Sequence, residues 1–260
     1  MFAPLDLSMI GRAVKNGLID FNVVNIRDFS RDKHKKTDDT PFGGGHGMVM
    51  MTDPIFRAMK SIGVDPDGDG PADAAGRNGH DAKGGGAPRR RVIYMSPRGR
   101  LLNKAIIEDL SHEDEVVILC GHYEGVDQRV LDYFGVEEIS VGDYILTGGE
   151  LPAMILVDAV ARMIPGVLAK EEAALDESVY SGLLEYPQYT QPRDYEGLEV
   201  PEVLLNGNHE LTDLWKFEQS LRLTRERRPD LFEKFVSEVR SGVKKLSKKQ
   251  QKILSQIRSE

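Results

Sequence analysis

The stretch VVILCGHYEG, residues 116–125, decides the fold, because five apolar residues run without interruption into a polar segment that contains glycine. A short apolar run that ends in turn residues is typical of a strand buried on both faces of a parallel sheet. The run RVIYM, residues 91–95, has the same character and leads into SPRG. We therefore predict two buried strands, each with a polar loop at its carboxyl end.

Helical segments separate the apolar runs. Residues 101–110 have helical spacing between the first two runs, and a third apolar run, residues 139–146, precedes a helical pattern over 151–164. Pro165-Gly166 is the stop signal of that helix. Strands that alternate with helices predict an α/β domain with a mainly parallel sheet. Upstream we expect helices over 5–19 and 54–62 and a strand over 21–26, and the whole domain covers residues 1–170.

Three later or inserted segments have a different character. Residues 63–90 hold eight glycines, three prolines and no aromatic residue, too little apolar surface to offset the entropy of ordering, so a flexible surface insertion is predicted. Residues 171–209 carry three prolines and little periodicity, which indicates an interdomain linker. Residues 210–260 return to helical spacing and predict a small all-α domain.

Charge is distributed unevenly along the chain. The net charge is −8, but residues 216–260 hold thirteen Lys or Arg and six Asp or Glu, so this segment is +7 and the remainder is −15. A basic segment indicates either a polyanionic partner or a solvated, charge-rich pair of helices, and charge alone favours the second. The single cysteine, Cys120, excludes an internal disulfide and fits a cytoplasmic protein. We expect neither a secretory signal nor a membrane span.

Three polar loops follow the apolar runs: YMSPRG (94–99), CGHYEG (120–125) and GDYILTGGE (142–150). Ligands of open α/β sheets bind beyond the carboxyl ends of the strands, and glycine lets the backbone approach a ligand closely. Each loop alone is explained as a tight turn, but three in succession indicate a site for a nucleoside-like cofactor. The chain has no dinucleotide or P-loop fingerprint, and its histidines lack metal-ligand spacing with Cys120, so no metal site is predicted.

Longer ordered blocks carry a family resemblance. They are RDF (27–29), DDTPFGGG (38–45), GHYEGVDQRV (121–130), SVGDYILTGGELPA (140–153), GLLEYPQYT (182–190) and VPEVLLNGNH (200–209). Together they resemble the bacterial tRNA (guanine-N1)-methyltransferase family, TrmD, of the SPOUT methyltransferases. The resemblance implies that the sheet of the N-terminal domain ends in a trefoil knot, and that the protein is a homodimer whose active site is shared between subunits.

The cofactor implied by the resemblance is S-adenosylmethionine, which the knot loops of the family hold in a bent form. Glu124 matches a glutamate near the cofactor, where an acidic group would favour a sulfonium, although a turn-capping role explains it equally well. The implied cofactor-binding residues lie on the three polar loops: Tyr94, Met95, Ser96, Pro97, Gly121, Glu124, Val141, Gly142, Asp143, Tyr144, Ile145, Leu146, Gly148, Gly149 and Pro152.

The implied reaction methylates N1 of the guanosine 3′ of the anticodon, position 37, where another guanosine precedes it. N1 carries a proton at neutral pH, so a general base and a cation near O6 are useful. The family's base lies five residues before the glycine of GLL, which is Glu177 here, with Asp176 beside it; register favours Glu177. Arg162 matches the arginine proposed to act at O6, or it is an ordinary cation at a helix C-terminus. The sequence shows no Mg²⁺ site and does not decide whether a divalent ion assists proton removal.

Two groups of residues are expected to contact the tRNA. One matches a family loop that helps receive the RNA, and its alternative is a simple mobile loop; it comprises Asp38, Asp39, Gly43, Gly44 and Gly45. The other group, Arg222, Arg225 and Arg228, lies in the helical domain, where contact with phosphates would position the tRNA without reading its sequence.

The chain departs from the family pattern at its start and at His122. Family members begin with a short apolar strand before the Met-Phe that opens this chain, and His122 stands where an arginine is usual. A missing strand would expose a sheet edge. A catalytically impaired RNA-binding homologue is therefore the alternative function. A nucleotide-dependent dehydrogenase is disfavoured by the absent dinucleotide fingerprint.

Overall fold

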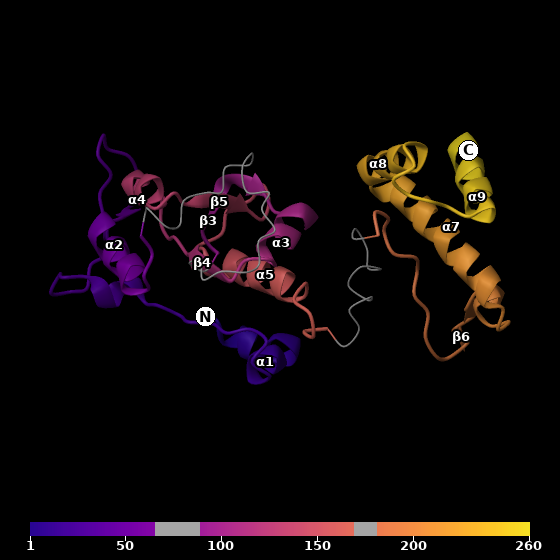
Figure 1. Ribbon diagram of the computed structural model, residues 1–260, viewed down its shortest axis with the longest axis horizontal. Coiled ribbons are helices and arrows are strands. Elements are labelled where there is room, and N and C mark those ends of the chain that lie inside the picture. The colour runs from indigo at the N-terminus through magenta and orange to yellow at the C-terminus, as the bar shows by residue number, and fades with distance from the viewer. Residues whose placement is uncertain (66–88, 169–180) are drawn as a thin grey trace, which may run out of the picture. The chain divides into compact units, whose positions relative to one another are not determined.

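The computed structural model describes residues 1–65, 89–168 and 181–260 (Figure 1). The chain divides into two compact units, Met1–Ala169 and Lys170–Glu260. Within the described residues, no helix is both long and apolar enough to cross a membrane.

A three-stranded parallel sheet forms the centre of the first unit. Its strands are β3 (Arg90–Leu101), β4 (Glu115–Leu119) and β5 (Glu137–Ser140), in the order β4-β3-β5. The two buried strands predicted from apolar runs are β3 and β4, and they are neighbours in the sheet. The predicted α/β class with a parallel sheet is confirmed.

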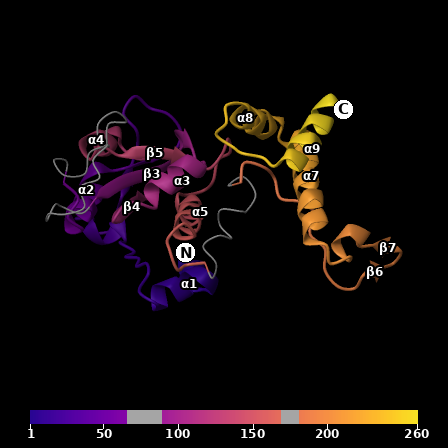
Figure 2. The ribbon, with the colours of Figure 1, turned by 45° about the vertical axis from the view of Figure 1, so that its right-hand side comes forward.

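Helices cover both faces of β3 (Figure 2). Val92 and Tyr94 pack in one apolar core with α2 (Thr52–Ser61) and α4 (Gln128–Tyr133). Ile93 and Met95, on the opposite face, pack with α3 (Lys104–Leu110) and α5 (Glu150–Ala161). Because side chains alternate between the faces of a strand, burial on both faces requires the continuous apolar run seen in the sequence.

The N-terminal region differs from the prediction. A 3-10 helix, η1 (Ala3–Asp6), and the helix α1 (Ser8–Lys15) replace the single helix expected over 5–19. The strand predicted for residues 21–26 is wrong, since these residues lead without strand pairing into the 3-10 helix η2 (Ile26–Phe29). A strand needs a hydrogen-bonded neighbour, and among the described residues β4 pairs only with β3, which leaves its other edge open.

The insertion predicted over 63–90 is too long at both ends. Val64 is fully buried in the core beneath α2, and Arg90 is the first residue of β3. Composition missed both because a core residue and a strand end lie directly beside the glycine-rich run. The rest of the predicted insertion, residues 66–88, lies outside the described residues.

Helices dominate the second unit. The helices predicted for residues 210–260 are present, and Asn208 and Ser247 cap the first and the last through side-chain bonds to Leu211 N and Gln250 N. Residues 181–184 fell within the predicted linker, yet Leu183 is buried in the helical core, with Leu221 and Ile257. The elements are β6 (Asp194–Tyr195), β7 (Leu198–Glu199), η3 (Glu202–Leu204), α7 (His209–Arg227), α8 (Pro229–Arg240) and α9 (Lys248–Ser259).

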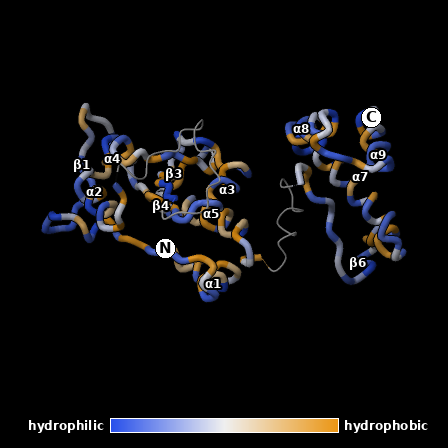
Figure 3. The backbone as a smooth tube through the Cα atoms, viewed as in Figure 1, coloured by the Kyte–Doolittle hydropathy of each residue, from blue (hydrophilic) through white to orange (hydrophobic). Residues whose placement is uncertain are grey.

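The helices α5 and α9 differ in hydropathy. In Figure 3 the hydrophobic colour is frequent along α5, which packs on the sheet, whereas α9 is largely hydrophilic. Only Leu254 and Ile257 of α9 are buried, and both face the core of the second unit. The remaining surface of α9 is therefore free to carry the basic residues noted in the sequence.

Candidate active site

The first polar loop is a bulge within β3. Met95 and Arg100 both pair with Ile139 of β5, so residues 96–99 leave the ladder between them. Tyr94 and Met95 are strand residues, as predicted for the run 91–95, while Ser96 and Pro97 lie in the bulge. The bulge re-aims the chain at the carboxyl end of the sheet, next to the end of β5.

The second and third polar loops are held together by their backbones. His122 and Gly148 form an isolated β-bridge, and the Gly149 amide donates to the Gly121 carbonyl at 2.8 Å. A Cβ on Gly149 would lie 2.7 Å from the Cα of Cys120, closer than side chains come to backbone. Gly149 is therefore required for this approach, and the loops 120–125 and 142–150 form one unit.

A side-chain pair reinforces the same junction. His122 Nε2 lies 2.6 Å from Glu150 Oε1. Glu150 opens α5, where the helix dipole favours a carboxylate. The sequence reasoning missed Glu150, because an acidic residue at a helix start is explained by the dipole alone. It also missed Tyr123, whose φ of +60° is a left-handed conformation that is rare for a non-glycine residue and found around functional sites.

Two titratable groups beneath the loops are kept neutral. Burial raises the pKa of the Tyr94 phenol, and Glu138 adds to the effect. Burial also raises the pKa of Cys120 to about 12, with a smaller contribution from Glu150. A thiol with this pKa is inert at neutral pH, as expected if Cys120 is a small packing residue and not a nucleophile.

The loop that was predicted to receive RNA lies beside Glu124. Asp38 and Asp39 form β1, which pairs with β2 (Val49–Met50). The Met50 amide donates to the Gly125 carbonyl at 2.9 Å, and the Glu124 amide donates to the Met48 carbonyl at 3.0 Å. Along this loop Gly43, Gly44, Gly45 and Gly47 have positive φ, and a Cβ on Gly47 would lie 2.6 Å from the Glu124 side chain.

The third loop leaves apolar side chains and backbone donors accessible. Tyr144 and Ile145 are 53% and 79% exposed, and Leu146 is also exposed. Among the described residues, no protein acceptor is bonded to the amides of Ile145 and Leu146. Exposed apolar side chains next to open amides suit a planar heteroaromatic ring. The loop also contains Val141, Gly142 (φ +151°) and the exposed Asp143, and Pro152 is buried in the first turn of α5.

The remaining predicted site residues fall into three groups. Arg162 is the C-cap of α5, a helix of 12 residues and so roughly 18 Å long, with the loops at its other end. Asp176 and Glu177 lie outside the described residues. Arg222, Arg225 and Arg228 belong to the second unit. In the part of the chain that is described, no three His, Cys, Asp or Glu side chains form a group that could hold a metal ion.

Comparison with known proteins gives the same family as the sequence blocks. A profile of the family described as tRNA (Guanine-1)-methyltransferase TrmD matches residues 1–234. The tRNA (guanine-N(1)-)-methyltransferase of Ruminiclostridium cellulolyticum is 52% identical over 227 residues, 87% of this chain and 89% of the relative. That of Clostridioides difficile is 48% identical over 230 residues (88% and 91%), and that of Alkaliphilus oremlandii 48% over 256 residues (98% and 93%).

The chain belongs to the TrmD family. The family profile spans the three polar loops of the first unit and ends within α8. Helix α9 therefore lies beyond the matched residues. The resemblance stated from the motifs is confirmed. The roles of individual site residues stay predictions.

Proposed function

We propose that this protein is a tRNA (guanine-N1)-methyltransferase that transfers the methyl group of S-adenosylmethionine to N1 of the guanosine 3′ of the anticodon, position 37. The observation that carries this proposal is the TrmD match over residues 1–234, which includes the bulge of β3 and the two loops joined by the His122–Gly148 bridge. A cytoplasmic location, where tRNA is modified, goes with the proposal.

The loops fit S-adenosylmethionine in chemical character. The open amides of Ile145 and Leu146 would donate to the adenine ring, and the exposed Tyr144 would cover it. The Glu124 carboxylate is exposed beside Gly47 and would attract the positive sulfonium or amino group. When bound, the cofactor supplies an electrophilic methyl carbon on sulfur. The His122–Glu150 pair and the Gly149–Gly121 hydrogen bond keep the two loops at a constant separation.

Proton removal is assigned to Glu177, with Asp176 as the neighbouring alternative. Guanine N1 loses its proton to the carboxylate while the N1–methyl bond forms and the methyl–sulfur bond breaks. Negative charge that spreads onto O6 is stabilised by the Arg162 guanidinium. No metal ion takes part in this scheme, and Mg²⁺ dependence is a matter for assay.

The proposal includes a homodimer in which Arg162 would act at the active site of the second copy. Leu151, Ile155, Asp158 and Arg162 follow one another at helical spacing along one face of α5, and Leu151 and Ile155 are 45% and 46% exposed. Exposed apolar residues on one face of a helix support a protein interface there. With the loops roughly 18 Å away at the other end of α5, Arg162 would serve the site of a second copy of the chain.

The knot and the tRNA contacts complete the proposal. The return of residues 147–150 against Cys120 and Gly121 is a close crossing of the kind that a trefoil knot requires. The 38–45 loop, held beside Glu124, would close over the anticodon loop. Arg222, Arg225 and Arg228 would contact tRNA phosphates.

The test is methyl transfer from labelled S-adenosylmethionine to an unmodified tRNA with guanosine at positions 36 and 37. The control is the same tRNA with adenosine at position 37. Label on the first tRNA alone is expected. Folded protein that binds the tRNA but transfers no label would overturn the catalytic proposal in favour of an RNA-binding homologue.

A further inference from the structure

Arg222 on α7 is held by two carboxylates in the free protein. Its Nε donates to Glu218 Oε1 at 2.9 Å, one turn earlier on the same helix. Its two terminal nitrogens donate to the two carboxylate oxygens of Glu260, at 2.6 and 3.0 Å. This paired geometry is the one that a guanidinium also uses for two oxygens of a phosphate.

The pair borders a surface pocket. Arg222, Arg225, Glu226 and Ile257 line an open pocket of about 300 Å³ between α7 and α9, which pack against each other (Figure 1). Arg225 donates to the main-chain carbonyl of Ile257, which holds its guanidinium at the rim. With Glu260 displaced, the Arg222 guanidinium would keep its bond to Glu218 through Nε, and its two terminal nitrogens would be open to another pair of oxygens.

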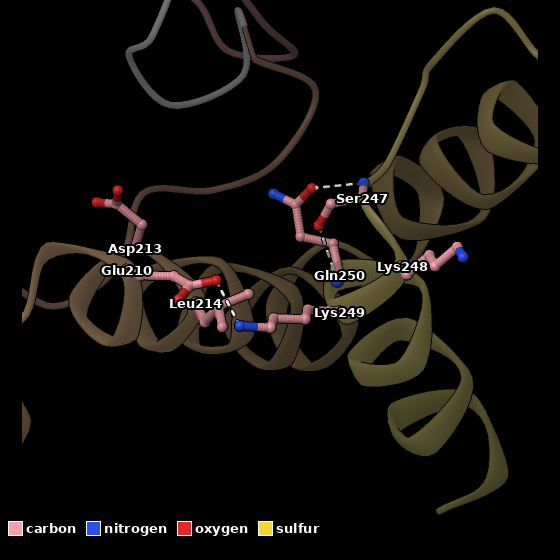
Figure 4. Close-up of a pocket in the computed structure, with 7 residues that line it drawn as sticks. All are labelled: Glu210, Asp213, Leu214, Ser247, Lys248, Lys249 and Gln250. Carbon is pink, nitrogen blue, oxygen red and sulfur yellow. Dashed lines mark hydrogen bonds and ion pairs between the residues drawn. The ribbon is translucent and has the colours of Figure 1, made fainter.

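A second pocket nearby lacks this character. It lies where α7 and α9 begin, and Figure 4 shows Lys249 directed at Glu210 across it. Asp213 lines the same pocket, and Lys248 is directed away from Glu210 and Asp213 (Figure 4). The Lys249 ammonium group is paired with Glu210 there, and the second carboxylate, Asp213, would repel an anion.

The Glu260 carboxylate is held weakly enough to be exchanged. The side chains of Arg222 and Glu260 are 41% and 49% exposed, and ion pairs between exposed groups contribute little to stability. Arg222 lowers the pKa of Glu260, because the guanidinium favours the charged carboxylate that pairs with it. A phosphodiester offers the same two acceptor oxygens and a full negative charge.

The surroundings favour a polyanion over a small phosphate. Lys245, Lys248, Lys252 and Arg258 are exposed on and beside α9, and within the described residues none of them has an ion-pair partner. A chain of phosphates could contact several of these cations at once, and each such contact adds counterion release to the binding free energy.

We propose that Arg222 and Arg225 form a subsite for an RNA backbone phosphate, that the Glu260 carboxylate occupies this subsite in the free protein, and that RNA displaces it on binding. This inference rests on the proposed function and assigns Glu260 as an internal competitor of the tRNA. It follows that removing the Glu260 charge strengthens tRNA binding, because the Arg222 guanidinium is then available to a phosphate.

The experiment compares Glu260→Gln with Glu233→Gln in the full-length protein. Glu233 is exposed on α8 without an ion-pair partner among the described residues, so its replacement makes the same change in net charge. Affinity for unmodified tRNA is measured by fluorescence anisotropy between about 50 and about 200 mM salt. We expect Glu260→Gln to bind about twofold to fivefold more tightly than Glu233→Gln, the range that an exposed ion pair supplies.

Arg222→Gln completes a double-mutant cycle. It is expected to weaken binding and to reduce the slope of log K against log salt by about 0.7 to 0.9, one phosphate contact. In the Arg222→Gln background, Glu260→Gln should increase the affinity for tRNA by no more than Glu233→Gln does. Equal affinities of Glu260→Gln and Glu233→Gln for tRNA would overturn the inference. Weaker tRNA binding by Glu260→Gln together with a lower melting temperature would also overturn it, because Glu260 would then have a structural role only.

Failure of the proposed function has a separate signature. Wild-type protein that neither methylates nor binds tRNA would remove both the function and the subsite. Wild-type protein that methylates tRNA, with no difference between Glu260→Gln and Glu233→Gln, would remove only the subsite.

Discussion

Gly149→Ala isolates the contact between the second and third polar loops. Gly149 has φ −79° and ψ −7°, a conformation that alanine adopts without strain, so the added methyl group acts only through the space it needs. It would lie 2.7 Å from Cys120 Cα and 2.8 Å from Gly121 N, where ordinary contacts begin at 3.4 Å. The loops must therefore separate by several tenths of an ångström.

This separation has two costs. Forcing a methyl group into packed backbone destabilises a protein by about 1–3 kcal/mol. The hydrogen bond from Gly149 N to Gly121 O, 2.8 Å in the wild type, is strained or lost, which adds about 1 kcal/mol. A displacement of cofactor loops approaching 1 Å can lower a reaction rate by about 100-fold.

Three measurements check this prediction: thermal unfolding, S-adenosylmethionine affinity by calorimetry, and kcat/KM for methyl transfer. We expect all three to fall in Gly149→Ala. The matched control is Gly197→Ala, which adds the same methyl group at φ +81° with no atom within 4 Å, in the β6–β7 turn of the second unit. It should cost about 1 kcal/mol of stability through its backbone conformation alone and leave cofactor affinity unchanged.

Two outcomes for Gly149→Ala would contradict this prediction. If Gly149→Ala melts at a lower temperature but binds S-adenosylmethionine like the wild type, the contact between the loops is structural and the cofactor site lies elsewhere. If its stability is also unchanged, the loops do not approach as closely as described.

Three further predictions concern the proposed chemistry. Glu177→Gln should lower kcat by about 100- to 10,000-fold and Asp176→Asn should not; the reverse ranking would move the base to Asp176. His122→Ala and Glu150→Gln should each raise KM for S-adenosylmethionine about tenfold with a smaller effect on kcat. His122→Arg, which can still pair with Glu150, should keep KM near the wild-type value. An unchanged KM in the first two variants would remove the positioning role of His122 and Glu150. Cys120 should be alkylated at pH 8 at least about 100-fold more slowly in the folded than in the urea-unfolded protein, because its pKa is raised to about 12. Stability should fall as pH rises above 9, where only the unfolded chain ionises this thiol; fast alkylation of the folded protein would contradict its burial.

Much of the first unit could be predicted because its signals are local. The runs 91–95 and 116–120 became β3 and β4, since strands buried on both faces need continuous apolar residues. The parallel sheet placed the polar loops at the carboxyl ends of its strands. Residues 21–26 have the alternation of a strand but no partner in the described structure, and pairing is a non-local property. The assignment of Val64 to a flexible insertion was wrong for the same reason, since burial depends on residues that are distant in the sequence.

The site shows a similar division. Sequence motifs named the loop residues and the family, but Glu150 became visible only when His122 was found 2.6 Å away, 28 positions earlier in the chain. The occupancy of Arg222 by Glu260, 38 positions later, could not be anticipated either. Contacts between residues that are distant in sequence carry no local signature.

By itself, the sequence determined the α/β class, the helices of the C-terminal segment, the polar loops and the TrmD family, because periodicity, turn residues and ordered motifs are properties of neighbouring residues. Only the tertiary structure decided which loops touch, that Gly149 must lack a side chain, that Cys120 is neutralised by burial, and that Arg222 already holds a carboxylate. The physical reason is that steric exclusion, desolvation and ion pairing depend on distances in space, which the folded chain sets between residues that the sequence keeps apart.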